Sequence, residues 1–327
     1  MALLIVRYRD GDIVRWGKLV GPAPMEASAT IDVVPLATAA ATTGGLIEAF
    51  GRGEIAAAGG EARLVAARDL LSPVTQDAAL ICQGLNYADH AAEAQHTARK
   101  QNLFFAKASS TLTGAYDDIE RPEEVELLDY EVEFGIVLRA GIGKGVVVDD
   151  SNIASYVAGI ILCDDVSARD IMFGASFLQW FQGKSYRTFC PAGPVLCLLE
   201  PEEVVKTLES LEIRLWVNGE LRQSSSSDKL IFKPAVTLTQ LARILDVKSG
   251  DLLLTGTPAG VTSPASPKLV EILKTHLMAD GTRRDELRVE MAKFRPFLQP
   301  GDVVTASLYD QHTGLSLGGQ QNRVRAA

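Results

Sequence analysis

Short apolar runs, several of them alternating with polar residues, recur along the chain and predict β-strands. In the first 75 residues three such runs are separated by Gly and Asp turns: LLIVRYRDG, DIVRWGKLV and ATIDVVPL. An Ala-rich stretch at about 42–58 predicts a helix after them. Beyond residue 75, strands are predicted at 79–83, 102–106, 131–138, 156–163, 194–199, 211–217, 251–255 and 302–309. Because few helices separate these strands, the pattern predicts a β-rich α+β fold and argues against a Rossmann arrangement.

The segment LLSPVTQ at 70–76, with Ser and Pro after a helical stretch, marks the predicted domain boundary. We therefore expect a small N-terminal α/β domain at 1–75 and a larger domain at 76–327. Residues 262–299 combine an amphipathic stretch with charge-rich sequence between two strand-like pieces, which predicts a helical insertion. A surface hairpin or an oligomer contact is the favoured interpretation, and a lid over a site is the alternative. The fragment GIGKG at 141–145 lacks the spacing of a phosphate loop and predicts a turn.

The composition is that of a folded protein, with 47% hydrophobic and 22% charged residues. A formal net charge of −9 argues against binding to nucleic acid or to anionic membranes, since both partners attract basic surfaces. The four cysteines show no CxxC motif and no metal-ligand spacing, so we expect reduced core residues and a cytoplasmic location. No apolar run approaches the roughly 20 residues of a membrane helix, and no export signal is recognisable. A small molecule or a cation is the binding partner that the negative net charge favours.

Two glutamates interrupt the apolar run LDYEVEFGIVL at positions 131 and 133. Successive side chains of a strand point to opposite faces, so Glu131 and Glu133 share one face while Val132 and Phe134 take the other. Two adjacent carboxylates raise each other's pKa unless a cation or a proton lies between them. The alternative is that both glutamates line a solvated face of the sheet or pair with Lys184 or Arg169.

A third acidic candidate lies where the apolar run YVAGIILCD gives way to DVSARD, and it is Asp164 or Asp165. Ionisable groups at the end of a buried strand cost free energy unless they are paired. Oxygen ligands without cysteine or clustered histidine suit a hard divalent ion, Mg²⁺ or Mn²⁺ first and Ca²⁺ second.

The stretch GLNYADHAAEA at 84–94 adds a possible general base. On a helical turn His90 and Glu93 are neighbours, and a carboxylate beside an imidazole fixes its tautomer and raises its basicity. The alternative is a surface ion pair at the start of a helix. Lys184, in QGKSYRTFCPAGP, is by itself only a loop lysine.

Taken together, these stretches resemble the fumarylacetoacetate hydrolase superfamily over about 80–325. The ordered motifs that carry the resemblance are GLNYADHAAE, DYEVEFGIVL, CDDVSARD, GKSYRTFCPAGP, VNGELRQ, LLTGTPAGV and PGDVV. The resemblance implies a mixed β-roll catalytic domain, usually dimeric, preceded in many members by a small N-terminal domain. It also implies Mg²⁺ or Mn²⁺ bound by Glu131, Glu133 and Asp165, with Asp164 beside the ligands rather than among them.

The resemblance further implies an enzyme that cleaves carbon–carbon bonds of β-diketo acids or decarboxylates oxaloacetate. A 2-oxo acid can chelate the ion, which then stabilises an enolate leaving group. His90, oriented by Glu93, would activate the attacking water. Lys184 and Arg169 would supply positive charge, and Thr257 would hold the substrate carboxylate. The leading expectation is a hydrolase of an acylpyruvate or another 1,3-diketo acid, active in the catabolism of aromatic compounds or sugar acids.

Two positions depart from the pattern of the superfamily. Met172 stands where many relatives have a substrate-contacting glutamine, which predicts an alkyl or aryl group on the substrate. Relatives often carry an FxKP motif, and the corresponding stretch here is FAKA, which keeps Lys107 but lacks the proline. We expect Lys107 to contact substrate.

Three alternatives stay open: oxaloacetate decarboxylation, isomerisation or hydration of an unsaturated 2-oxo acid, and a non-catalytic protein that binds a 2-oxo acid.

Overall fold

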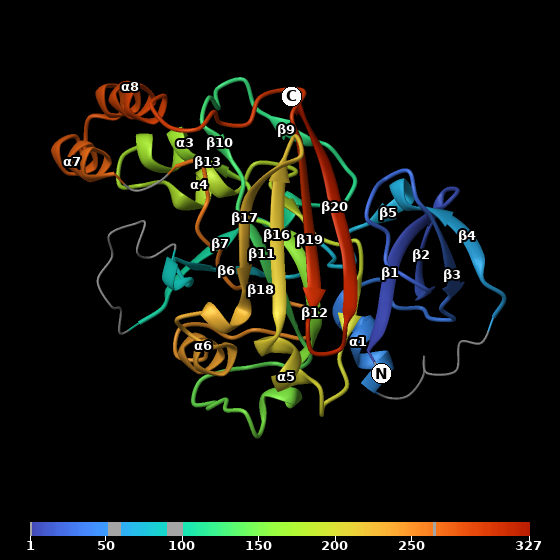
Figure 1. Ribbon diagram of the computed structural model, residues 1–327. Helices are drawn as coiled ribbons and strands as arrows, with labels where there is room; N and C mark the ends of the chain where they lie inside the picture. The colour runs from blue at the N-terminus through green and yellow to red at the C-terminus, as the bar shows by residue number, and fades with distance from the viewer. Residues whose placement is uncertain (1, 52–59, 90–100, 264–265) are drawn as a thin grey trace.

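The computed structural model describes residues 2–51, 60–89, 101–263 and 266–327, and a pair of β-sheets packed face to face forms its centre (Figure 1). The larger sheet has the strand order β4 (Arg63–Ala66), β3 (Thr30–Pro35), β2 (Ile13–Val20), β1 (Leu3–Asp10), β15 (Leu196–Leu198), β12 (Val157–Asp164), β11 (Val132–Leu138), β18 (Leu252–Leu254), β6 (Leu80–Gly84), β7 (Leu103–Lys107). Strand β5 (Leu70–Leu71) also pairs with β1. The second sheet runs β17 (Glu220–Ser226), β16 (Leu211–Val217), β19 (Val303–Asp310), β20 (Leu315–Ala326), β9 (Ile119–Arg121). The β-rich α+β class expected from the sequence is confirmed.

Strand β11 shows how the two faces of the larger sheet are used. Its residues Val132, Phe134 and Ile136 belong to the main core, together with apolar residues of β16 and β19 from the second sheet. The opposite face, which carries Glu133 and Val137, packs in a separate core that includes residues of helix α1 (Thr43–Gly51). Period-two alternation therefore assigns the glutamates of this stretch to the face away from the main core.

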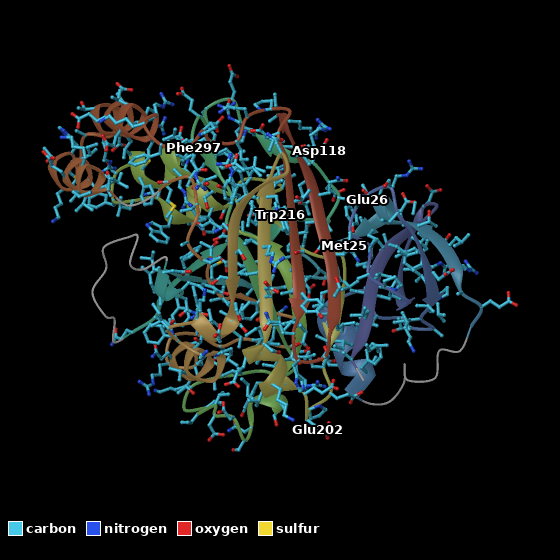
Figure 2. The ribbon with its side chains drawn as sticks, viewed as in Figure 1. Met25, Glu26, Asp118, Glu202, Trp216 and Phe297 are labelled. Atoms are coloured by element: carbon cyan, nitrogen blue, oxygen red, sulfur yellow. The ribbon has the colours of Figure 1, made fainter. Side chains whose placement is uncertain are left out.

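The N-terminal strands continue the larger sheet without a break. Leu3 of β1 lies opposite Leu198 of β15 in an antiparallel pair, so backbone pairing joins residues on both sides of the boundary expected at 70–76. Met25 lies where the N-terminal strands meet β20, and Gly319 N–H donates to Pro24 O at 2.9 Å nearby (Figure 2). The division into domains at 1–75 and 76–327 stays a prediction, and the described contacts between the two parts are extensive.

Apart from α1, which packs against one face of the larger sheet, the described helices gather at two ends of the sheets (Figure 1). Helices α5 (Val204–Glu209) and α6 (Pro234–Leu241) lie at one end, and α3 (Arg169–Gly174), α4 (Trp180–Lys184), α7 (Pro267–Thr275) and α8 (Asp280–Met291) lie at the other. The segment 262–299 contains α7 and α8, whose apolar residues share a small core with Phe297, labelled in Figure 2. Residues 141–145 contain a turn, as expected.

The remaining short elements connect these layers. They are the pairs β10 (Leu128–Asp129) with β13 (Ser167–Ala168) and β8 (Leu112–Thr113) with β14 (Cys190–Pro191), and the 3₁₀ turns Ala67–Asp69, Ser109–Thr111, Ile153–Ser155 and Ser227–Lys229. All four cysteines are buried and free, as the sequence predicts. Within the described ranges, no helix has both the length and the apolar character needed to span a bilayer.

Candidate active site

Three carboxylates converge where β11 begins and β12 ends. The two strands are antiparallel, with Val132 opposite Asp164, so the residues that flank this pair are brought together. Glu131, Glu133 and Asp165 each offer an oxygen within 4.8 Å of the others. Their exposed fractions are 7%, 0% and 0%. The structure thus selects Asp165, and Asp164 instead accepts a hydrogen bond from Glu131 N–H at 2.8 Å.

Two lysines contact these acids from inside the protein. Lys184 Nζ lies between Glu131 Oε2 at 2.7 Å and Asp165 Oδ2 at 2.6 Å. Lys107 Nζ lies 2.5 Å from Asp165 Oδ1 and also donates to a backbone carbonyl. Burial alone would lower the pKa of Lys184, but the carboxylates of Asp165 and Glu131 outweigh this effect and raise it. The two carboxylates beside Lys184 therefore favour its charged ammonium form.

Arg169 links the cluster to a fourth carboxylate that the sequence analysis missed. Its guanidinium lies 2.6 Å from Glu131 Oε1 and 2.9 Å from Asp129 Oδ2. Asp129 is fully buried and also accepts hydrogen bonds from Thr262 N–H and Ser263 N–H, at 3.0 and 3.1 Å. The signal for Asp129 was present in the sequence, because it precedes Glu131 by two residues and so continues the same alternation.

Glu133 differs from its neighbours in how its oxygens are used. Its Oε2 accepts a hydrogen bond from Gly256 N–H at 2.6 Å, but Oε1 has no partner among the described residues. Burial first, and then the charges of Asp165 and Glu131, raise its pKa well above the usual value. The alternative of pairing with Lys184 or Arg169 holds for Glu131 and has no counterpart in the described contacts of Glu133. A buried carboxylate oxygen without a protein partner is stabilised by a proton, a cation or a water molecule.

The charge balance of the cluster also indicates a bound cation. Five buried carboxyl groups meet three buried cations: Asp129, Glu131, Glu133, Asp164 and Asp165, with Lys107, Arg169 and Lys184. Burial raises the pKa of Asp164 to about 7, opposed by its hydrogen bond from Glu131 N–H. Asp164 and Glu133, whose pKa values are raised, are also the members that have an oxygen without a partner among the described residues. An all-oxygen donor set with an excess of negative charge fits a hard divalent cation held by Glu131, Glu133 and Asp165.

The turn after β18 supplies the backbone donor to Glu133. Gly256 has a φ of +94°, and a Cβ at this position would lie 2.9 Å from the Cβ of Asn86. Both the dihedral angle and the lack of space require glycine here. This turn lies in the motif LLTGTPAGV, in which the resemblance assigned a role only to Thr257.

We expect Gly256→Ala to lower the free energy of unfolding by about 2 kcal/mol, because it combines a strained φ with a steric clash. Chemical denaturation measures the change. Gly281 is the control, because it is exposed on α8 and a Cβ there would meet open space, so Gly281→Ala should raise stability by about 0.5 kcal/mol. Equal stability of Gly256→Ala and the wild-type protein would contradict the role given to this turn.

A pocket of about 170 Å³ opens next to the acids. Glu131, Arg169, Lys184, Thr257 and Met172 contribute to its wall, together with apolar side chains from several elements. The hydroxyl of Thr257 donates to Val132 O at 3.0 Å and accepts from Gln223 Nε2 at 2.8 Å. Gln223, another residue that the sequence analysis missed, fixes the orientation of Thr257 from β17.

The predicted site residues other than the three acids fall into three groups. Arg169, Lys184, Thr257 and Met172 line the pocket, and their contacts with substrate stay predictions. Lys107 does not, because its ammonium is bound to Asp165, so its contacts fit a role in orienting that carboxylate rather than in binding substrate. His90 and Glu93 lie outside the described residues.

The helical segment 262–299 also reaches the pocket. Leu269, Val270 and Leu273 of α7 form part of its wall. The segment therefore fits the favoured expectation of a surface hairpin, and α7 also takes part in shaping the pocket, while an oligomer contact stays a prediction. The alternative, in which this segment covers the site, agrees with its position.

Relatives of known name match somewhat more than half of the chain. Oxaloacetate tautomerase FAHD2B of Bos taurus is 39% identical over 192 residues, and FAHD2A of Homo sapiens is 35% identical over 191 residues. Each alignment covers 58% of this chain and 59% of the relative, so the match spans less than two thirds of the relatives' length.

Solved structures match the whole fold. Fumarylacetoacetate hydrolase from Exiguobacterium antarcticum is 27% identical with a TM-score of 0.68, covering 99% of this chain and 100% of that one. The 5-carboxymethyl-2-hydroxymuconate delta-isomerase from Mycobacterium smegmatis is 23% identical with a TM-score of 0.66 over the full length of both chains, which supports the fold alone. The sequence profile described as fumarylacetoacetate hydrolase C-terminal matches residues 79–325. With three quarters of its length matched, this chain belongs to the fumarylacetoacetate hydrolase family.

Proposed function

We propose that this protein is a divalent-metal-dependent hydrolase that cleaves a carbon–carbon bond of an acylpyruvate or another 1,3-diketo acid. The observation that carries the proposal is the convergence of Glu131, Glu133 and Asp165, with Glu133 Oε1 unpartnered among the described residues, beside a pocket. These three residues would hold Mg²⁺ or Mn²⁺, with Ca²⁺ as a weaker alternative. When bound, such an ion supplies Lewis-acid stabilisation of negative charge on the oxygens of a 2-oxo acid.

The side chains around the acids have complementary tasks. Arg169 and Lys184 place positive potential at the wall of the pocket, where it favours the substrate carboxylate and charge that develops on an oxygen. Thr257 lines the same space, and its hydroxyl is held in place by Val132 O and Gln223 Nε2. The apolar side chains opposite exclude water and strengthen these interactions.

In this proposal His90, oriented by Glu93, removes a proton from water, and the resulting hydroxide attacks the second carbonyl carbon. The bond to the neighbouring carbon then breaks, and that carbon receives the proton. The products are a carboxylic acid and pyruvate or a related 2-oxo acid. The assignment of His90 and Glu93 to water activation rests on the sequence motif GLNYADHAAEA.

Tautomerisation of oxaloacetate is the second candidate. The names of the relatives that are 35–39% identical favour it. This reaction moves a proton between carbon and oxygen and requires no attacking water.

A homodimer and a cytoplasmic location stay predictions.

Acetylpyruvate and oxaloacetate, each supplied with Mg²⁺ or Mn²⁺, distinguish the candidates. The proposal predicts loss of the ultraviolet absorbance of the diketone together with release of acetate and pyruvate, and loss of this activity after chelation. Proton exchange or decarboxylation of oxaloacetate without cleavage of acetylpyruvate would contradict it. The absence of turnover on every 2-oxo acid would favour a non-catalytic binding protein.

We expect His90→Ala to reduce hydrolysis by about 10²-fold while Mn²⁺ still binds, because a general base contributes this much without touching the ion. Steady-state kinetics and Mn²⁺ titration measure the two effects separately. His312, exposed in a turn, provides the control, and His312→Ala should keep full activity. Unchanged turnover in His90→Ala would remove this residue from the mechanism.

A further inference from the structure

The pocket has two chemically different parts. Next to the acids its wall contains Glu131, Arg169, Lys184 and Thr257. The remaining lining side chains, apart from Gln83 and Ser263, are apolar, and we call them the apolar wall: Leu85, Phe105, Met172, Phe173, Trp180, Val261, Leu269, Val270 and Leu273. A substrate whose carboxylate lies at the acidic end therefore places its other end against hydrocarbon.

Aromatic rings give the apolar wall a fixed shape. The ring of Trp180 meets Phe105 at a centroid distance of 5.2 Å and Phe173 at 6.4 Å, both edge to face. Lys184 Nζ lies 5.1 Å from the centroid of Phe105, so this ring marks the junction between the cationic and apolar parts. Such contacts favour one arrangement of the rings over others.

Helix α7 completes the apolar wall from the other side. Leu269 is buried in a small core shared with α8, which anchors the helix. Val270 and Leu273, on the same helix, are more exposed and line the pocket. This apolar surface comes from the segment between LLLTGTPAGV and PGDVVTASL.

The positive charges of the pocket are held beside the acids. Arg169 contacts Asp129 and Glu131, and Lys184 contacts Glu131 and Asp165, all at 2.6–2.9 Å. Among the described residues of the apolar wall, none carries a charge. A second carboxylate at this end of the substrate would lose water without gaining a cation, which is unfavourable.

We propose that this enzyme selects 2-oxo acids whose far end is an alkyl or aryl group, and that it discriminates against substrates with a second carboxylate at that end. The inference rests on the proposed function and adds the substrate class. This class differs from the compounds in the names of the tautomerase and isomerase relatives, which carry more than one carboxylate.

N-substituted oxamates test the inference, because they carry the carboxylate and adjacent carbonyl of a 2-oxo acid but do not react by C–C cleavage. Binding of oxamate and its N-butyl, N-phenyl and N-carboxymethyl derivatives is measured by calorimetry with and without Mg²⁺. We expect N-phenyl oxamate to bind at least about tenfold more tightly than N-carboxymethyl oxamate, with up to about fourfold gained per added methylene. Tighter or equal binding of the N-carboxymethyl compound would overturn the inference.

A charge placed on the apolar wall provides the reciprocal test. Val270→Lys should strengthen binding of N-carboxymethyl oxamate relative to N-phenyl oxamate by about tenfold. Thr275→Lys adds the same charge at an exposed position of α7 that does not line the pocket, and it should leave the ratio unchanged. An unchanged ratio in Val270→Lys would also count against the inference.

Failure of the proposed function and failure of the proposed substrate class give different binding results. Oxamate that binds only with Mg²⁺ supports the proposed site whatever its substituent. Oxamate that binds equally well without Mg²⁺, or not at all, contradicts the proposed function itself. Metal-dependent binding combined with a preference for the N-carboxymethyl compound overturns only the assignment of substrate class.

Discussion

Glu133→Gln is expected to reduce Mn²⁺ affinity and turnover by about 10³-fold, the equivalent of about 4 kcal/mol. The substitution keeps the shape of the side chain and an oxygen that can accept from Gly256 N–H. It replaces the carboxylate, whose Oε1 lacks a partner among the described residues, with a neutral amide. Because a neutral amide is a weaker ligand than a carboxylate, the ion loses both a ligand and a charge.

Asp164→Asn is the matched control for this substitution. Asp164 is equally buried and accepts from Glu131 N–H, a contact that asparagine can keep. Since Asp164 lies outside the converging triplet, we expect Mn²⁺ affinity to fall by no more than about tenfold. Calorimetric Mn²⁺ titration and thermal unfolding distinguish loss of the ion from loss of the fold. Wild-type Mn²⁺ affinity in Glu133→Gln would show that the triplet is not the metal site.

Lys184→Met is expected to separate metal binding from turnover. The ammonium of Lys184 lies between Glu131 and Asp165, so it competes electrostatically with any cation at these acids. Its removal should leave Mn²⁺ affinity unchanged or higher. Turnover should fall by about 10²-fold, because the pocket loses a preorganised positive charge.

The control for Lys184→Met is Lys144→Met, at an exposed position of the turn at 141–145, which should behave as wild type. Removing one member of a buried ion pair also destabilises a fold, so unfolding is measured with saturating Mn²⁺ present. Full turnover in Lys184→Met would exclude this residue from the site. Loss of Mn²⁺ binding in a folded Lys184→Met variant would contradict the electrostatic argument.

The apolar strands could be predicted because burial and periodicity agree in them. The run at 156–163 became β12, which is buried along its whole length, and the run at 131–138 became β11. In each case continuous or alternating apolar residues reflect the faces of the sheet that they occupy.

Strands with polar sequences could not be found in this way. β17 reads ELRQSSS and β20 reads LSLGGQQNRVRA, and neither shows a clear apolar pattern. Gln320 in β20 is buried because its amide donates to the carbonyls of Leu162 and Pro191, at 3.0 and 3.1 Å. Partners so distant in sequence leave no local signal, since the hydrogen bonds that permit this burial exist only in the folded chain.

In the site, too, contacts between residues distant in sequence could not be predicted. Alternation within one strand placed Glu131 and Glu133 on a common face before any tertiary contact was known. The choice of Asp165 over Asp164 required the family motif, and the structural reason is the register between β11 and β12. The contact between Lys107 and Asp165 joins residues 58 positions apart, and nothing in the local sequence indicates it.

The most direct test of the metal site is anomalous diffraction from crystals of the wild-type protein grown with Mn²⁺. We predict an anomalous peak at about 2.0–2.6 Å from carboxylate oxygens of Glu131, Glu133 and Asp165. A saturated crystal with no peak among these three side chains, or with Mn²⁺ bound only elsewhere, would contradict the account.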